Sequence, residues 1–297
     1  MEIGLSLPQI GDDATSENAI EFAQFAEECG YNSLWVVDHV VLHEDGTNRY
    51  PYSRDGALAV PPKDNFLEPL TLLTYIAGAT QRIQLATGVL VLPMREPILH
   101  AKMIATLDHL SGGRFILGAG VGWWKEEFEV LGVSPRTRGK RMDESLLLLR
   151  EMWSGEPVHF ESSMFKVDGW VSQPTPSRRI PIWLGGENKN QLERVGKYAD
   201  GWLPTAGKSF ETFLSDFEVA KQAAVSAGRD PEELIIAMVG AARISVGRMQ
   251  DAFERLEELK NAGVSHVSIG ARGSLSEQFN AIKEFSTEYL PRLQSND

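Results

Sequence analysis

The sequence predicts an α/β protein that folds as a single (β/α)8 TIM barrel domain spanning residues 1–297. Short apolar runs alternate eight times with longer segments of helical periodicity. Most of these runs are uniformly apolar, as expected of strands whose two faces are both covered. An open, doubly wound sheet is the alternative fold. The loop after the first expected strand, residues 8–11, lacks the GxGxxG sequence with which such a sheet binds dinucleotides.

The first half of the chain supplies four strand–helix units. Ile3, Leu5 and Leu7 share one face of the first expected strand, 2–7. Apolar residues then recur with helical spacing over 16–30, which ends at a glycine suited to the position after a helix. The other elements of this half are expected, in order, at 33–39, 66–79, 83–92, 97–110, 114–117 and 138–153. Four further units are expected at 180–186, 191–198, 201–204, 210–227, 234–239, 249–262, 266–270 and 275–290.

Two insertions interrupt this rhythm, one after strand two and one before strand five. The first, residues 40–65, leaves the carboxyl end of a strand, which is the catalytic side of a barrel. It carries Tyr50, and we expect it to act as a lid over the substrate. The second, residues 154–179, contains VHFESSMFKVDGWV, which predicts a β-hairpin followed by a proline-rich return. It begins on the opposite face of the barrel, where it would serve packing or dimerisation.

Composition limits the classes of partner. The hydrophobic content of 42% and charged content of 24% are typical of a globular enzyme. A formal net charge of −12 argues against binding to nucleic acid or to an anionic membrane. No stretch reaches the roughly 20 apolar residues of a membrane span, and the chain enters a strand at once without a visible signal peptide, so a cytoplasmic protein is expected. No histidine pair with carboxylates has metal-ligand spacing, and we expect no metal.

The most informative segment is GGRFILGAGVGWWKEEFEVLG, residues 112–132. A buried strand runs into a glycine-spaced elbow that includes Gly120 and Gly122, and two tryptophans, Trp123 and Trp124, follow. Glycines allow positive φ or close approach of the backbone to a ligand. Two indoles at the carboxyl end of a strand predict a wall for a flat ring, the alternative being a glycine-tightened turn with core tryptophans. Glu126 and Glu127 follow in the first turn of the next helix, where acidic residues favour the helix dipole, and a part in catalysis is the alternative.

Asp38 and His39 end the second expected strand and would therefore face the mouth of the barrel. Histidine titrates near neutrality, which suits a proton donor or a residue that positions substrate. The alternative is a capping residue beside a hydrogen-bonded imidazole. In the third strand, Gly88 lies between Thr87 and Val89, and a glycine inside a strand indicates a bulge or close backbone approach.

Two regions are candidates for binding a phosphate group. Gly185 and Gly186 precede a helix, whose first N–H groups attract anions, although Glu187 is an unfavourable neighbour. The commoner phosphate site of barrels follows strands seven and eight. In this chain that region carries Arg272, which we expect to contact substrate or the tail of a coenzyme.

The chain resembles the luciferase-like monooxygenase superfamily, and within it the oxidoreductases that depend on the deazaflavin coenzyme F420. The similarity covers nearly the whole chain. It rests on LWVVDHVV, TGVLVLPMREPILHAKMIATLDHLSGGRFILGAGVGWWKEEFEVLGV, RGKRMDESLLLLREMW and IPIWLGGENKNQLERVGKYADGWLP, in this order and spacing. The resemblance implies a barrel that holds a flavin or deazaflavin ring in the mouth at the carboxyl ends of its strands.

The resemblance also implies roles for individual residues. The histidine that matches His39 lies beside the reactive carbon of the ring in F420-dependent relatives, and the aspartate that matches Asp38 contacts the ring. The family has a non-prolyl cis peptide where this chain has Gly88–Val89, and a glycine pair near the coenzyme phosphate where it has 185–186. The residues expected to bind the coenzyme are Asp38, Thr87, Gly88, Val89, Gly120, Gly122, Trp123, Gly185 and Gly186. Those expected to line the substrate pocket are Tyr50, Trp124, Thr205 and Arg272.

One departure narrows the expected chemistry. The sugar-phosphate dehydrogenases of the superfamily carry a glutamate base where this chain has Trp123, and an indole cannot accept a proton. Thr205 nevertheless matches a position that contacts phosphate in those enzymes. We therefore expect an F420-dependent oxidoreductase that moves a hydride between the deazaflavin and a small organic substrate, with His39 handling the proton. The alternatives are a two-component monooxygenase that uses reduced FMN and oxygen, and a flavin-binding protein without turnover. The resemblance also admits a homodimer, since family members often pair through outer helices.

Overall fold

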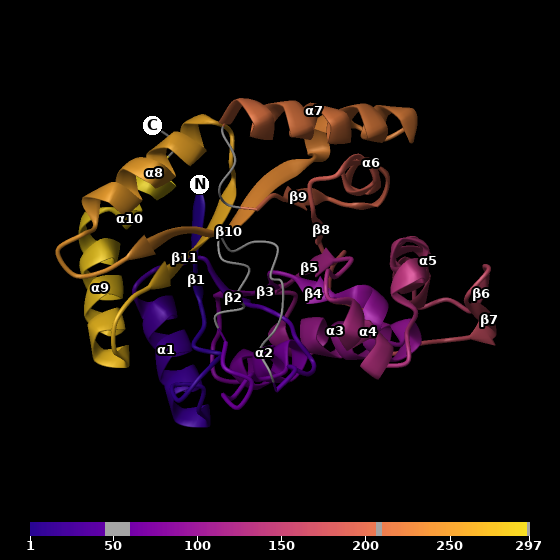
Figure 1. The fold of residues 1–297 in the computed structure, drawn as a ribbon, viewed down its shortest axis with the longest axis horizontal. Helices are drawn as coiled ribbons and strands as arrows, with labels where there is room; N and C mark the ends of the chain where they lie inside the picture. Colours follow the sequence, from indigo (N-terminus) through magenta and orange to yellow (C-terminus); the bar gives the residue numbers. More distant parts are fainter. Residues whose placement is uncertain (45–59, 206–209, 296–297) are drawn as a thin grey trace.

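A computed structural model of the protein describes residues 1–44, 60–205 and 210–295. Eight parallel strands close into a barrel with helices around it, so the predicted (β/α)8 fold is confirmed (Figure 1). The order around the ring is β1–β2–β3–β5–β8–β9–β10–β11, and β11 pairs with β1. The barrel strands are β1 (Glu2–Ser6), β2 (Ser33–Val36), β3 (Gln84–Thr87), β5 (Phe115–Gly120), β8 (Ile182–Gly185), β9 (Gly201–Leu203), β10 (Ile235–Ile244) and β11 (His266–Ala271).

The helices alternate with these strands and cover their outer faces. They are α1 (Ser16–Glu28), α2 (Pro69–Ala77), α3 (Pro97–Ser111), α4 (Lys125–Val130), α5 (Arg138–Met152), α6 (Lys189–Tyr198), α7 (Phe210–Ser226), α8 (Gln250–Asn261), α9 (Leu275–Glu288) and α10 (Leu290–Gln294). Their buried faces and the outward faces of the strands form the main hydrophobic core. Across the described ranges, no helix combines the length and the apolar character needed to cross a membrane.

Four of the differences from the predicted element boundaries are informative. The second strand ends at Val36, so Asp38 and His39 lie just beyond it. The third predicted strand is divided after Thr87, and its continuation β4 (Leu90–Val91) pairs with β5. Strand β10 is longer than predicted because a bulge after Met238 lets it resume pairing with β11. The last predicted helix is divided into α9 and α10 at Tyr289.

The interior of the barrel is filled by side chains rather than left open. Trp35 and Trp183 stack inside it with ring centroids 5.8 Å apart. A side chain at Gly4 would not fit beside them, since an added Cβ would lie 2.6 Å from Trp35 Nε1. The Trp35 indole donates to Ser33 Oγ at 2.8 Å, which satisfies its polar atom inside the core. The barrel is therefore a packed column below its mouth.

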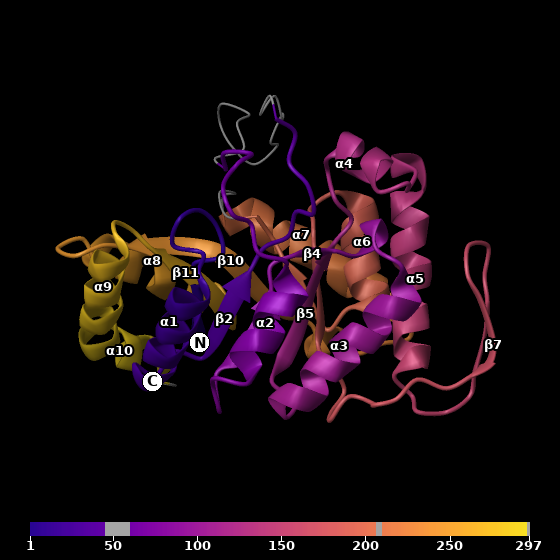
Figure 2. The ribbon, with the colours of Figure 1, turned by 90° about the horizontal axis from the view of Figure 1, so that it is seen from below.

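Because the strands are parallel, their carboxyl ends meet at one rim, and the loops that follow them form the mouth. Figure 2 shows α4 at this rim, at the end of the molecule opposite the two chain termini. The segments on either side of the first insertion rise from the same rim. All the site residues predicted from the sequence that the structure describes follow or end these strands. Tyr50 lies outside the described residues, as does most of the predicted lid.

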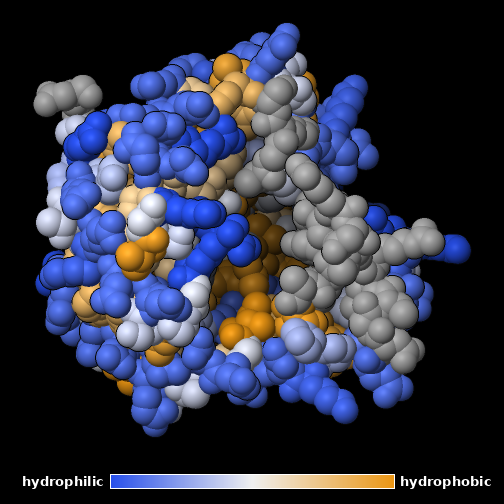
Figure 3. Space-filling view, turned by 60° about the vertical axis from the view of Figure 1, so that its left-hand side comes forward, coloured by the Kyte–Doolittle hydropathy of each residue, from blue (hydrophilic) through white to orange (hydrophobic). Residues whose placement is uncertain are grey.

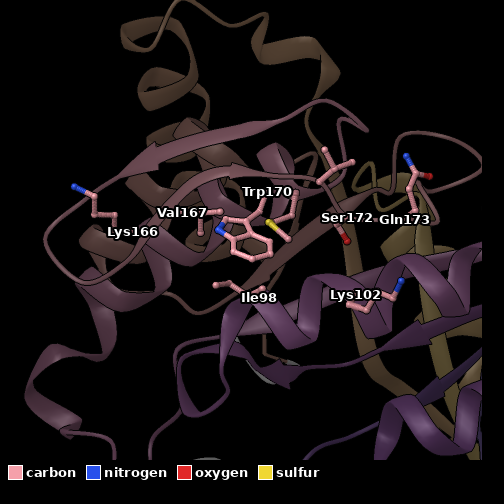
Figure 4. Close-up of a pocket in the computed structure, with 9 residues that line it drawn as sticks. Ile98, Lys102, Lys166, Val167, Trp170, Ser172 and Gln173 are labelled. Atoms are coloured by element: carbon pink, nitrogen blue, oxygen red, sulfur yellow. The ribbon is translucent and has the colours of Figure 1, made fainter.

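The second insertion forms the predicted β-hairpin, with β6 (Val158–Glu161) and β7 (Lys166–Trp170) antiparallel. It lies outside α5, away from the mouth (Figure 2). Between the hairpin and α3 is a groove of about 390 Å³, where Trp170 lies near Ile98 and Lys102 (Figure 4). Trp170 remains 72% exposed. The hairpin therefore contributes to the outer surface of the barrel and not to its mouth.

Candidate active site

The centre of the candidate site is a buried pair between His39 and Glu127. His39 Nδ1 lies 2.9 Å from Glu127 Oε2. The other carboxylate oxygen, Oε1, accepts hydrogen bonds from the backbone N–H of Val40 at 2.7 Å and of Val41 at 3.4 Å. The Glu127 side chain is completely buried, whereas 11% of the His39 side chain is exposed. Glu127 thus connects α4 to the chain that leaves β2, and His39 faces outward from this pair.

Asp38 is anchored on the other side of the same turn. Its carboxylate accepts a hydrogen bond from the Val91 N–H and one from Arg95, both at 2.8 Å. Arg95 also contacts Glu68 Oε1 at 3.3 Å. Burial raises the pKa of Asp38, and the Arg95 guanidinium and the Val91 amide oppose this change. Consecutive residues are therefore fixed in opposite directions, with Asp38 bound to the third strand and His39 bound to α4.

Aromatic rings surround the imidazole. The Trp123 and Trp124 rings stack with centroids 5.5 Å apart and planes at 7°. Both rings contact His39 edge-to-face, with ring centroids 5.8 Å apart, and Phe66 makes a similar contact at 5.9 Å. Trp124 is buried and Trp123 is partly exposed. These rings hold the plane of the imidazole, and the predicted role of the two indoles as a wall for a flat ring stays a prediction.

The floor of the mouth is formed by the break in the third strand. The Gly88–Val89 peptide is cis, as the resemblance implied. An added Cβ at Gly88 would lie 2.7 Å from Val239 Cγ2, so this position requires glycine. Thr87 is fully buried and donates to the Gly118 carbonyl at 2.7 Å, which ties the break to β5 from below. Val89 is partly exposed and packs above the interior side chains.

Glycines on the neighbouring strands make room for this floor. An added Cβ at Gly120 would lie 2.6 Å from Val89 Cγ2, and one at Gly185 would lie 3.3 Å from Val89 Cγ1. Gly122 has φ of 76°, and an added Cβ would lie 2.6 Å from Val91 and 2.7 Å from Phe128. Packing in the protein therefore accounts for Gly120 and Gly122. The space-filling view shows an apolar hollow beside the residues drawn in grey (Figure 3).

The glycine pair after β8 is also held by its neighbours. The Gly186 carbonyl accepts a hydrogen bond from Trp202 Nε1 at 2.8 Å, and its φ of 117° requires glycine. Asn188 caps α6 by accepting from the Gln191 N–H at 3.1 Å. Glu187 accepts hydrogen bonds from the backbone N–H, at 2.8 Å, and the hydroxyl of Thr205. The two predicted residues Gly186 and Thr205 thus lie on one rim segment, with a carboxylate between them.

Arg272 is exposed just beyond β11, where its N–H donates to the Ile244 carbonyl at 3.0 Å. Its guanidinium therefore lies on the rim formed by the last strands, and its predicted contact with substrate stays a prediction. Over the part of the chain that the structure describes, no group of three or more His, Cys, Asp or Glu side chains could hold a metal ion.

The sequence interpretation undervalued three residues of this site, namely Glu127, Arg95 and Glu68. Glu127 had been explained chiefly by the helix dipole, with a part in catalysis as the alternative, and in the structure it is the buried partner of His39. Arg95 and Glu68 had no assigned role, although Arg95 completes the Asp38 anchor. The signal in the sequence was Arg95 itself, which comes directly after the apolar run 90–94. An arginine that is buried there needs a carboxylate partner.

The residues present fit a planar heterocycle. Beyond the carboxyl ends of the strands, Val89 supplies an apolar surface, Trp123 and Trp124 supply stacked indoles, and His39 supplies an imidazole. Such a mixture of apolar walls and few polar groups is typical of a small-molecule site. The first N–H groups of α6 offer a polar end for an anionic tail. Glu187 is an acidic neighbour there, but its carboxylate is engaged by Thr205.

Comparison with known proteins agrees with this architecture. An uncharacterized protein of Mycobacterium tuberculosis is 30% identical over 253 residues, which cover 85% of this chain and 84% of that protein. A phthiodiolone/phenolphthiodiolone dimycocerosates ketoreductase of Mycobacterium bovis is 33% identical over 250 residues, 82% of this chain and 64% of the ketoreductase.

Solved structures show the same fold. An F420-dependent secondary alcohol dehydrogenase, in complex with an F420-acetone adduct, superposes with a TM-score of 0.78 at 20% identity over 99% of each chain. The oxygenating constituent of 3,6-diketocamphane monooxygenase from Pseudomonas putida, in complex with FMN, has a TM-score of 0.74 at 17% identity over 98% of each chain. The sequence profile of the luciferase-like monooxygenases matches residues 1–263. This chain therefore belongs to the luciferase-like monooxygenase family.

Proposed function

We propose that this protein is an oxidoreductase that uses coenzyme F420 to interconvert a small secondary alcohol and the corresponding ketone. The observation that carries the proposal is the His39 imidazole, held at the rim by Glu127 and surrounded by three aromatic rings. Such a site offers one titratable group in apolar surroundings, which suits transfer of a single proton. Two known proteins support the choice of substrate class, since one is named a ketoreductase and the other a secondary alcohol dehydrogenase.

The chain would hold the coenzyme through features already described. Val89 and the glycines opposite it would support the flat ring, and Trp123 would cover one side of the pocket. The amino end of α6 would face the phosphate of the tail. When bound, the coenzyme supplies or accepts the hydride, which is the part of the chemistry that amino-acid side chains do not provide.

The part of the reaction assigned to the protein is proton transfer and positioning. During oxidation the carbinol carbon gives up a hydride and the hydroxyl proton passes to His39; during reduction His39 returns that proton to the carbonyl oxygen. The aromatic rings exclude water from the reacting atoms, which strengthens the electrostatic interactions there. No described carboxylate takes the place of the glutamate base found in the sugar-phosphate enzymes, because Trp123 occupies that position.

Titration with the two candidate coenzymes tests the proposal. The pure protein would be mixed with F420 and with FMN, each oxidised and reduced, and binding would be followed by the visible spectrum and fluorescence. We expect F420 to bind and to be reduced by a secondary alcohol from a panel of small alcohols. Binding of FMN alone, with consumption of oxygen when reduced FMN and a ketone are supplied, would establish the monooxygenase alternative. That alternative is favoured by the FMN-containing neighbour. Binding of either coenzyme without turnover of any substrate would support the third alternative, a flavin-binding protein that is not an enzyme.

A further inference from the structure

We infer that Glu127 is a positioning residue that selects Nε2 of His39, and not Nδ1, as the nitrogen that faces the reaction. The assignment of the hydrogen within the imidazole rests on geometry alone. Its consequence for catalysis rests on the proposed role of His39 in proton transfer.

The environment of Glu127 is unusual for a glutamate in the first turn of a short surface helix. Its neighbour Glu126 is exposed, as expected there, whereas the Glu127 side chain is completely buried. A buried carboxylate must be compensated by hydrogen bonds or by charge. Glu127 has three hydrogen bonds, two from the backbone amides of Val40 and Val41 and one from the ring of His39. The carboxylate therefore acts on His39 and on the first residues beyond β2 together.

These partners determine which His39 nitrogen carries hydrogen. The two backbone amides only donate, so Oε1 must accept from them. A carboxylate has no hydrogen of its own, so Oε2 also accepts, and Nδ1 at 2.9 Å must be the donor. The neutral ring then has its hydrogen on Nδ1 and its lone pair on Nε2. Among the described residues, Nε2 has no hydrogen-bond partner, so it remains available to a substrate.

The orientation of the ring is fixed independently. Phe66, Trp123 and Trp124 meet the imidazole at interplanar angles of 88°, 79° and 72°. A half-turn of the ring about the Cβ–Cγ bond would place Cδ2 where Nδ1 lies, break the bond to Glu127 and leave its carboxylate oxygen buried without that partner. The aromatic contacts fix the plane of the ring, and the bond to Glu127 fixes which edge of the ring faces the carboxylate, so Nε2 is the nitrogen that serves both directions of the reaction.

The isosteric substitution Glu127→Gln tests this inference. A glutamine side chain offers one acceptor and one donor group. Val40 and Val41 still require the acceptor, so the amide NH2 of glutamine would face Nδ1. Nδ1 must then accept, and the ring hydrogen moves to Nε2. The variant keeps the shape of the site but exchanges the roles of the two ring nitrogens.

The primary measurement is the tautomer itself, read from long-range ¹⁵N–¹H NMR spectra of histidine side chains. The chain has six histidines, and the His39 signals would be assigned by their absence in His39→Gln. We expect Nδ1–H in the wild-type protein and Nε2–H in Glu127→Gln. The matched control is Glu126→Gln, on the same turn of α4 but exposed, which should leave the spectrum of His39 unchanged.

A wild-type spectrum with Nε2–H would overturn the inference by itself, whether or not the variant folds. So would an unchanged Nδ1–H signal in folded Glu127→Gln. With an active coenzyme–substrate pair, Glu127→Gln should lower kcat by about 10²-fold or more while leaving coenzyme affinity unchanged, as expected when a general base has its hydrogen on the wrong nitrogen. If instead His39→Ala retains full turnover, the proposed proton transfer fails, but the tautomer measurements still decide the role of Glu127.

Discussion

Trp123 and Trp124 are consecutive in sequence, yet their indole rings stack almost in parallel, with centroids 5.5 Å apart. Consecutive residues of a strand point to opposite faces, so this stacking requires the chain to have left β5. The positive φ of Gly122 marks where the turn begins. The two rings then differ in burial, since Trp124 is in the core and Trp123 borders the mouth.

Alanine substitutions should separate these two positions. Trp124→Ala removes a buried ring and should lower the free energy of unfolding by about 3–5 kcal/mol. Trp123→Ala should cost much less stability, because its ring is only partly buried, and should weaken binding of coenzyme or substrate if the ring has the role proposed for it. Urea unfolding and coenzyme titration would measure the two effects. Equal losses of stability in both variants would contradict the assignment of Trp123 to the pocket.

His39→Ala should leave coenzyme binding largely intact and lower turnover by about 10²–10⁴-fold, the usual contribution of a general acid or base. Binding would be followed by fluorescence titration and turnover by steady-state kinetics. His159→Ala, on the exposed hairpin, is the matched control and should change neither quantity. Normal turnover in His39→Ala would remove this residue from the proton-transfer step.

Gly120→Ala should strain the floor of the mouth, because the new methyl group would lie 2.6 Å from Val89 Cγ2. Overpacking of this kind costs about 1–3 kcal/mol. Adding Val89→Ala should restore part of that loss, since the two side chains compete for one space. Gly78→Ala is the control, as its added methyl meets nothing closer than 3.7 Å. Failure of the double variant to regain stability would show that the loss arises elsewhere.

The pH dependence of stability should depend in part on a contact at the closed end of the barrel. Glu2 lies 2.9 Å from His266, and the hydrogen bond from His266 lowers the pKa of Glu2 below its usual 4.5. A carboxyl group with a lower pKa in the folded state stabilises the fold above pH 4.5, and this contribution is lost as the pH falls through its folded pKa. Between pH 6 and 3.5, Glu2→Gln should therefore lose less stability than the wild-type protein does.

Urea unfolding at a series of pH values would measure this difference. The effect should be modest because the Glu2 side chain is 40% exposed. Glu21→Gln, at an exposed position on α1, is the control, because it removes the same charge where there is no contact with a histidine. Parallel pH curves for the wild-type protein and Glu2→Gln would contradict the prediction.

The strands, helices and hairpin were predictable because each depends on local patterns. The apolar run of β8 and the alternation in β6 and β7 identify these elements without knowledge of their neighbours. Boundaries were less accurate where tertiary contacts decide them. The division of the third strand depends on how Gly88 packs against Val239 on β10, a contact that no local pattern records.

The candidate site was predictable only in part, for the same reason. His39 could be recognised from its place after a strand, but Glu127 is 88 residues away in sequence. Helix α4 has only six residues, too few for periodicity to show which of two adjacent glutamates points inward. Gly122 was predicted to take a positive φ or to approach a ligand. Its φ is positive, and no local pattern shows that Val91 and Phe128 fill the space where its side chain would lie.

The stacked indoles of Trp35 and Trp183 have a consequence for how ligands enter and leave the barrel. They fill the interior of the barrel below the rim, so a molecule bound at the rim could not leave through the barrel. Under the proposed function, reactant and product would therefore both have to pass between the loops that follow the strands.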